Sequence, residues 1–170
     1  MHKRKLYLDC DGVILDTIKT SYKLIRNENL TTEDEIHVFY KNINWEKLII
    51  ISGEINNSIS KIKLLSAHFE IEILTHVNSA EEATAKIAYF RKELPGINVI
   101  PVFKSTDKCD AVHPKGAILV DDFVDNLKKW EEKGGISIKF SDSGKESGFI
   151  TITDLLQLLE IEFINKIKKK

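Results

Sequence analysis

The sequence has few cysteines, little net charge and no long hydrophobic run. Of its 170 residues only Cys10 and Cys109 are cysteines, and they form no C-x-x-C pair, so neither a disulfide framework nor a zinc site is expected. The formal net charge is −1, so no global field favours a nucleic-acid polymer or a membrane as a partner. The apolar run after the basic N-terminus is interrupted at Asp9, so we expect no signal peptide, no membrane span and a cytoplasmic location.

Internal repeats and Gly/Ser-rich linkers are also absent, and the terminal lysines are the one low-complexity tract. Hydrophobic residues make up 42% of the chain and charged residues 30%, as in ordinary globular domains. This length and composition suit one domain with a real hydrophobic core and room for a small insertion. They leave the oligomeric state open.

Five short segments rich in Ile, Val, Leu or aromatic residues are expected to be buried strands. They are residues 5–9, 69–75, 97–103, 117–121 and 136–140. Helical patterns occur at residues 53–67, 79–94 and 123–133, and a last helix is expected to open at residues 151–154. Strands that alternate with helices predict an α/β fold, a Rossmann-like three-layer sandwich with a mostly parallel five-stranded sheet.

The segment between the first two strands is long. It has about sixty residues, far more than a helical crossover needs. We therefore expect a small helical cap at residues 18–52, inserted into a core domain formed by residues 1–17 and 53–170. The aromatic residues of this cap, Phe39, Tyr40 and Trp45, could stack against a nucleobase or form a small core of the cap itself.

Acidic side chains gather where the expected strands end. Asp9 and Asp11 follow the first strand in the stretch LYLDCDGVILDT, and Asp121 and Asp122 end the fourth. Ligands of parallel α/β sheets bind beyond the carboxyl ends of the strands, so these residues should meet at one edge. Carboxylates this near to one another repel, so a cation or a proton must lie between them. Carboxylates with main-chain oxygens form a hard oxygen site for Mg²⁺.

Groups that could bind an anion lie at the same edge. Thr75 ends the second strand with a hydroxyl, Gly12 lets an anion approach the loop amides, and Lys104 or Lys108 brings positive charge. Lys115 also precedes the fourth strand, but the distance from AILVDD favours Lys108. A metal site beside an anion site suits a phosphate group.

The order and spacing of these motifs resemble the haloacid dehalogenase (HAD) superfamily of phosphohydrolases. LYLDCDGVILDT is similar to its first motif, and EILTHVNS to its second. A lysine before the fourth strand is similar to the third motif, and AILVDDFVDN to the fourth in its DD form. DxDG alone is a modest indication, whereas four motifs in order are a strong one, and the resemblance covers the sheet but not the cap.

The resemblance implies a role for each matching residue. Asp9 would be the nucleophile that forms an aspartyl-phosphate, and Asp11 the general acid and then the base that activates water. Mg²⁺ would be held by the carboxylates of Asp9 and Asp122 and by the main-chain carbonyl of Asp11. Thr75 and Lys108 would hold the phosphoryl oxygens. Superfamily members that displace halide lack the second acid, so Asp11 favours phosphate-ester hydrolysis.

Three further residues lie close to these motifs. Asp121 could touch the metal directly or act from behind its ligands, and we expect one of Asp121 and Asp122 to cap the following helix. His76 and Asn78 follow the second strand without an assigned role.

The short insertion and the ILVDDFVDN stretch resemble the 5′-nucleotidase or deoxyribonucleotidase-like group. We therefore expect a Mg²⁺-dependent phosphomonoester hydrolase whose partner is a small phosphorylated substrate, a nucleoside or deoxynucleoside monophosphate. One alternative is a phosphatase for another small ester, such as a sugar or amino-acid phosphate. The other is a non-catalytic module of this fold that binds phosphate or a partner protein.

Overall fold

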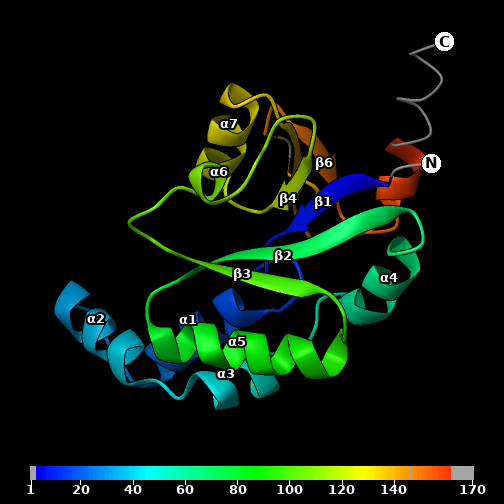
Figure 1. The fold of residues 1–170 in the computed structure, drawn as a ribbon. Helices are drawn as coiled ribbons and strands as arrows, with labels where there is room; N and C mark the ends of the chain where they lie inside the picture. The colour runs from blue at the N-terminus through cyan, green and yellow to red at the C-terminus, as the bar shows by residue number, and fades with distance from the viewer. Residues whose placement is uncertain (1–2, 146, 162–170) are drawn as a thin grey trace, which may run out of the picture.

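A computed structural model describes residues 3–145 and 147–161 of the chain (Figure 1). Its six strands form one sheet in the order β3-β2-β1-β4-β5-β6, and each neighbouring pair is parallel. The strands are β1 (Arg4–Leu8), β2 (Phe69–Val77), β3 (Asn98–Phe103), β4 (Ile118–Asp121), β5 (Ile136–Phe140) and β6 (Ile150–Ile152). The predicted Rossmann-like α/β fold with a parallel sheet is confirmed, with six strands instead of five.

The additional strand, β6, lies where the last helix was expected to begin. It has three residues, which is too short to show a period in the sequence. The helix that follows it starts later, and residues 157–161 are helical.

Helices cover both faces of the sheet, as the three-layer prediction requires. They are α1 (Thr17–Asn27), α2 (Glu33–Asn42), α3 (Trp45–Ser52), α4 (Ser58–Leu65), α5 (Ala80–Glu93), α6 (Lys108–Ala111) and α7 (Val124–Glu132). Leu6 and Leu8 of β1 join the hydrophobic cluster that contains α4 and α5, whereas Tyr7 joins the cluster with Trp130 of α7 on the opposite face. Figure 1 shows α6 and α7 on one side of the strands and α5 on the other.

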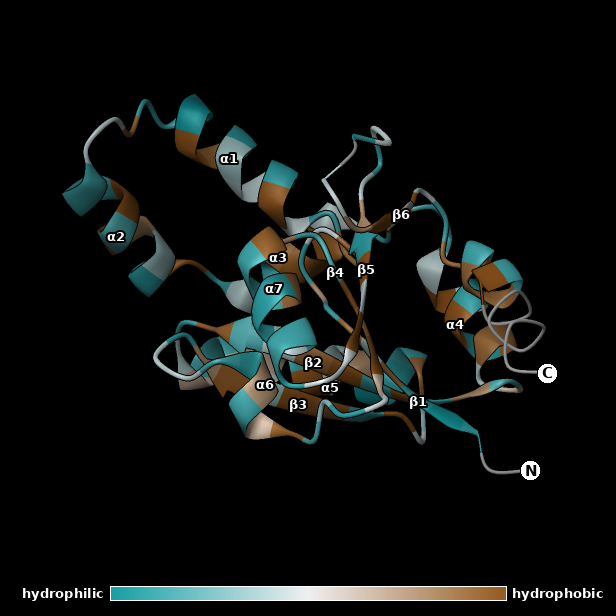
Figure 2. Ribbon diagram, turned by 90° about the horizontal axis from the view of Figure 1, so that it is seen from above, coloured by the Kyte–Doolittle hydropathy of each residue, from teal (hydrophilic) through white to brown (hydrophobic). Residues whose placement is uncertain are grey.

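The helices α1, α2 and α3 occupy the long segment between β1 and β2. Trp45, Leu48 and Ile49 of α3 are buried in the same cluster as Leu6 and Leu8, so α3 shares the main core. All residues of α2 are at least partly exposed, and Figure 2 shows α1 and α2 extending away from the sheet. The division into a core and a cap at residues 18–52 stays a prediction. None of the helices in the described part of the chain has the length and apolarity to cross a bilayer.

Candidate active site

Three carboxylates meet at the carboxyl ends of β1 and β4. These two strands pair in parallel, and the N–H of Asp9 extends their ladder by donating to the carbonyl oxygen of Val120 at 2.9 Å. This pairing places Asp9 beside Asp121 and Asp122. One carboxylate oxygen from each of the three lies within 4.8 Å of the others. The acidic residues that are far apart in the sequence therefore converge as expected.

A buried lysine lies between two of these carboxylates. Lys108 at the start of α6 places its Nζ 2.6 Å from Oδ1 of Asp9 and 2.7 Å from Oδ2 of Asp121. Burial lowers the pKa of Lys108, but Asp121 and Asp9 outweigh burial and hold the pKa above its ordinary value. Lys104 is exposed and lines the cavity described below. Lys108, and not Lys104, thus contacts Asp9, the candidate nucleophile.

The cluster of Asp9, Asp121 and Asp122 carries more negative charge than Lys108 alone balances. Burial raises the pKa of Asp9 well above its usual range, and Asp121 and Asp11 add to the rise against the effect of Lys108. Burial and then Asp121 raise the pKa of Asp122 to about 6. Oxygen donors with a surplus of negative charge fit a hard divalent cation such as Mg²⁺. Asp9 and Asp122 are the side chains that would hold it.

Gly12 packs against the Asp122 carboxylate. Its φ is +78°, and a Cβ atom there would lie 2.4 Å from Oδ2 of Asp122. The N–H of Gly12 donates to the carbonyl oxygen of Leu15 at 2.9 Å, so the turn already uses this amide. The Gly12 amide itself is therefore not available to an anion, and the approach of an anion to the loop amides stays a prediction. The position needs glycine because the Asp122 carboxylate approaches so closely.

The carboxylate of Asp11 is held at both oxygens. Thr17 Oγ1 donates to Oδ1 at 2.6 Å, and Lys86 Nζ lies 2.5 Å from Oδ2. Burial raises the pKa of Asp11, but Lys86 and Thr17 together bring the pKa below its ordinary value. Sequence reasoning missed both Thr17 and Lys86. The i,i+4 pair of Glu82 and Lys86 in α5 was the available indication.

The last residues of β2 and the residue that follows it support this arrangement. Thr75 is buried near the end of β2, and its Oγ1 lies 3.4 Å from Oδ2 of Asp11. His76 Nε2 is 3.0 Å from the carbonyl oxygen of Thr106, and burial is the main cause that lowers the pKa of His76. Asn78 donates to Glu82 Oε2 from both its N–H and its Nδ2, at 2.7 and 2.8 Å.

Asp121 has its carboxylate fully engaged. Oδ1 accepts from the N–H of Phe123 at 2.8 Å, which fixes the start of α7, and Oδ2 accepts from Asn126 Nδ2 at 2.9 Å as well as from Lys108. Asp121 thus acts at the helix start and behind the proposed metal ligands, whereas Asp122 lies beside Asp9. Neither residue caps α7, because the N-cap position is Phe123 and no side chain caps it, so the expected helix cap is not formed.

A cavity of about 590 Å³ opens over these groups. Its walls include Asp9, Asp11 and Lys108, and two exposed rings, Tyr22 of α1 and Phe123. Neither ring was predicted from the sequence to border the site.

The predicted cap aromatics divide between several environments. Trp45 is 7% exposed and stacks on Tyr40 with ring centroids 6.3 Å apart, so it belongs to the core although it borders the cavity. Tyr40 is half-buried, lines the same cavity and donates its hydroxyl to Ser21 Oγ at 3.1 Å. Phe39 faces a different cavity between α1, α2 and α3.

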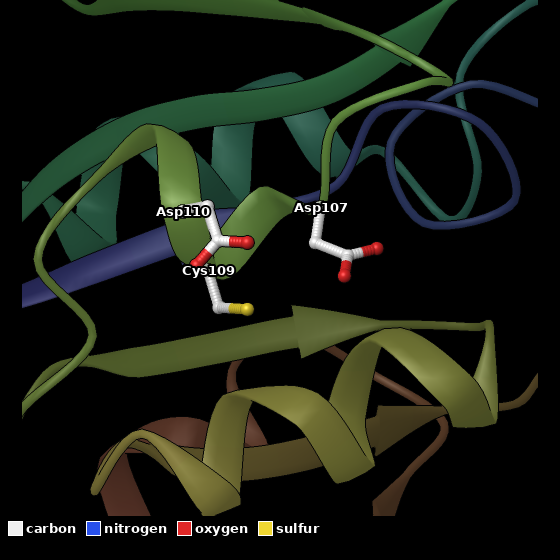
Figure 3. Close-up of side chains that lie close together, drawn as sticks. All are labelled: Asp107, Cys109 and Asp110. Carbon is white, nitrogen blue, oxygen red and sulfur yellow. The ribbon is translucent and has the colours of Figure 1, made fainter.

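A second acidic cluster surrounds α6, where Asp107 and Asp110 lie near Cys109 (Figure 3). Lys129 lies 2.6 Å from Asp107, and Lys133 lies 3.2 Å from Asp110. These lysines balance the two carboxylates. Burial raises the pKa of the Cys109 thiol. The cluster therefore offers no surplus charge for a cation.

The parallel sheet and the helices around it match the fold of solved structures described as HAD hydrolases. No family model matches the sequence, and no curated protein matches it. Among solved structures, the fold is similar to YfnB from Bacillus subtilis, described as a HAD-hydrolase bound to magnesium, with a TM-score of 0.67 and 13% identity over 95% of this chain and 99% of that one.

Two further solved structures share the fold. A HAD-superfamily hydrolase of subfamily IA from Geobacter sulfurreducens has a TM-score of 0.63 and 11% identity, over 94% of this chain and 100% of that chain. D,D-heptose 1,7-bisphosphate phosphatase from Burkholderia thailandensis has a TM-score of 0.56 and 16% identity, over 95% of this chain and 99% of that chain. At these identities the likeness shows the fold alone.

Proposed function

We propose that this protein is a Mg²⁺-dependent phosphomonoester hydrolase that acts through an aspartyl-phosphate on Asp9. The observation that carries the proposal is the position of Lys108, 2.6 Å from Asp9 and 2.7 Å from Asp121, with the Asp122 carboxylate beside them. A nucleophilic carboxylate, a buried cation and further acidic oxygens at one cavity floor are the groups that phosphoryl transfer requires. The fold neighbours support it, because they include a phosphatase and a magnesium-bound hydrolase.

The roles of the residues follow from their placement. Asp9 is the nucleophile that attacks phosphorus in line, and Lys108, which borders the cavity, holds the phosphoryl oxygens as negative charge develops. Thr75 is given the same role by its motif alone, since its buried hydroxyl contacts Asp11 and Lys86.

Asp11 lies two residues beyond Asp9 and borders the same cavity. The negative charge of a bound phosphate opposes the effect of Lys86 and Thr17 on the pKa of Asp11 and favours the protonated carboxyl that the first step needs. That carboxyl gives its proton to the leaving oxygen, and the resulting carboxylate then takes a proton from the water that attacks the aspartyl-phosphate.

The carboxylates of Asp9 and Asp122 and the main-chain oxygen of Asp11 would hold the metal. Bound there, Mg²⁺ supplies positive charge that offsets the repulsion between the carboxylates and the phosphate. Asp121 and Asn126 lie behind the proposed metal ligands and stabilise their positions, because Asn126 Nδ2 donates to Asp121 Oδ2 at 2.9 Å.

For the substrate, we propose nucleoside or deoxynucleoside monophosphates. A cavity of about 590 Å³ is in the range of small-molecule sites. The exposed rings of Tyr22 and Phe123 on its walls can stack a base. A panel of nucleotides, sugar phosphates and amino-acid phosphates with Mg²⁺ tests this proposal. Equal turnover of esters with and without a base would favour the other small esters.

The decisive experiment for the reaction is hydrolysis of 4-nitrophenyl phosphate with Mg²⁺ and with EDTA. We expect turnover that needs the metal and that falls at least about 10³-fold in Asp9→Asn. The matched control is Asp34→Asn, an exposed aspartate of α2, which should keep full activity. Equal turnover in Asp9→Asn, or no turnover with any ester, would favour a non-catalytic module that binds phosphate or a protein.

A further inference from the structure

Two charged residues of α5 are buried in the interior. Lys86 is 0% exposed and Glu82 is 2% exposed, and their side chains lie 2.8 Å apart. A buried charge is costly unless it is paired and hydrogen-bonded, and a buried pair often contributes no net stability. Their position beside Asp11 points to a functional reason for the pair.

Lys86 contacts Asp11 but does not line the cavity. Its Nζ lies 2.5 Å from Asp11 Oδ2, 3.0 Å from Thr75 Oγ1 and 3.1 Å from the carbonyl oxygen of His76, in addition to Glu82. An ammonium group has three protons, so these four acceptors engage all of them. Because Lys86 has no exposed surface, it acts on the substrate only through the side chains that it contacts, and Asp11 is the nearest of them.

Glu82 fixes the position of Lys86. One of its carboxylate oxygens pairs with Lys86, and the other accepts from the N–H and the Nδ2 of Asn78. The N–H of Glu82 also donates to Ser79 Oγ at 3.1 Å at the start of α5. The hydrogen-bonded chain from Asn78 through Glu82 to Lys86 thus ties the Asp11 carboxylate to the end of β2.

We propose that Lys86, anchored by Glu82, is a positioning residue that orients the Asp11 carboxylate toward the leaving oxygen. The inference rests on the proposed function, because it assigns a role within that reaction. Thr17 holds the other oxygen of Asp11 at 2.6 Å, so the two contacts together fix the plane of the carboxylate. Proton transfer depends on such geometry, since the acid must lie within hydrogen-bonding reach of the leaving oxygen.

The two buried lysines of the site therefore have separate tasks. Lys108 contacts the nucleophile candidate Asp9, whereas Lys86 contacts the acid candidate Asp11. Loss of Lys86 should impair the substrates that depend on protonation of the leaving oxygen and should affect others much less. A lysine that only stabilises the fold would not discriminate between leaving groups.

The test compares Lys86→Met with the wild-type protein on 4-nitrophenyl phosphate and phenyl phosphate, in the presence of Mg²⁺. The 4-nitrophenolate departs without a proton, whereas phenolate benefits from one. We expect kcat/KM to fall about 100-fold or more for phenyl phosphate, the range of general acid catalysis, and less than about tenfold for 4-nitrophenyl phosphate. The control is Lys92→Met, on the same helix, with 83% of its side chain exposed.

A double-mutant cycle asks whether Lys86 acts through Asp11. In an Asp11→Asn background the additional change Lys86→Met should reduce kcat/KM for phenyl phosphate by less than about threefold, because the group that it positions is gone. Losses that multiply in the double variant, or equal losses on both substrates, would overturn the inference. The proposed function would stand in either case, since the wild-type protein would still hydrolyse both esters.

Folding is checked by circular dichroism and thermal melting of each variant. Lys86→Met leaves the Glu82 carboxylate without its cation. If this variant does not fold for that reason, the double variant Glu82→Gln/Lys86→Met, which removes both charges, takes the place of Lys86→Met in the comparison. If this double variant does not fold either, Lys86 is a structural residue and the inference is overturned. Absence of Mg²⁺-dependent turnover in the wild-type protein would instead defeat the proposed function.

Discussion

The Asp122 carboxylate occupies the space that a side chain at position 12 would need. An alanine Cβ there would lie 2.4 Å from Asp122 Oδ2, and the φ of Gly12 is +78°. The carboxylate can rotate away, so we expect Gly12→Ala to fold but to lose a metal ligand. Its affinity for Mg²⁺, measured by isothermal titration calorimetry, should fall at least about tenfold, equivalent to about 1.4 kcal/mol.

The matched control is Gly96→Ala. Gly96 has a φ of +91°, and a Cβ atom there would meet nothing within 4 Å. It shares the backbone strain of about 1–2 kcal/mol but not the contact with a carboxylate. Equal Mg²⁺ affinities in the two variants would show that the contact between Gly12 and Asp122 does not matter for the metal.

Lys108 should be important for both stability and turnover. Lys108→Met leaves Asp9 and Asp121 buried without the cation that contacts both of them. We expect the free energy of unfolding in EDTA, measured by urea denaturation, to fall by about 3–5 kcal/mol. Turnover should fall at least about 100-fold. The control is Lys104→Met, which changes an exposed lysine of the same cavity and should keep the free energy of unfolding within about 0.5 kcal/mol of the wild type. Similar losses in both variants would contradict the assignment of Lys108 as the cation of the site.

Much of the fold and part of the site were predictable from the sequence, because buried strands are short apolar runs and parallel strands end at one edge. Asp9, Asp122 and Lys108 therefore come together as their positions suggested. The helix after β2, α5, shows where prediction from the sequence is incomplete. Its apolar stripe, Ala83, Ile87, Phe90 and Leu94, predicts the buried face, and Phe90 and Leu94 are indeed buried. Ala83 and Ile87 are only half-buried, whereas the charged residues Glu82 and Lys86 are buried.

The reason is that charge normally predicts exposure, and only the tertiary structure supplies the partners that allow burial. Lys86 pairs with Asp11, which lies far from it in the sequence. Ser79 and Glu82 have the spacing that predicts a capping box, but only half of the motif forms. Ser79 accepts from the Glu82 N–H, but the Glu82 carboxylate bonds Asn78 and Lys86 and not the Ser79 N–H.

Mg²⁺ binding should depend on pH near 6. The pKa of Asp122 is raised to about 6, by burial first and then by Asp121, so this carboxyl is mostly protonated at pH 5 and mostly ionised at pH 7. A metal binds the ionised form, so its affinity falls as the pH falls. With one group of this pKa, the affinity at pH 5 should be about tenfold weaker than at pH 7.

Calorimetric titrations with Mg²⁺ at pH 5, 6 and 7 check this dependence. The raised pKa of Asp9 acts in the same direction, so the change can exceed tenfold. Asp122→Asn should bind Mg²⁺ more weakly and with a shallower dependence on pH. An affinity that is constant from pH 5 to 7 would exclude Asp122 as a ligand that titrates in this range.

Finally, two aromatic residues near the cavity should respond differently to truncation. Tyr22 is 55% exposed on the cavity wall, whereas Trp45 is 7% exposed within the core. Tyr22→Ala should raise KM for nucleoside monophosphates about tenfold, since stacking on a base contributes about 1–3 kcal/mol, and should leave KM for 4-nitrophenyl phosphate within about threefold. Trp45→Ala should instead lower the free energy of unfolding by about 3–5 kcal/mol, because it opens a space in the core. Steady-state kinetics and urea denaturation of both variants separate these effects. Unchanged nucleotide KM in Tyr22→Ala would remove the support that this ring gives to a nucleotide substrate, and the sugar and amino-acid phosphates would then be preferred.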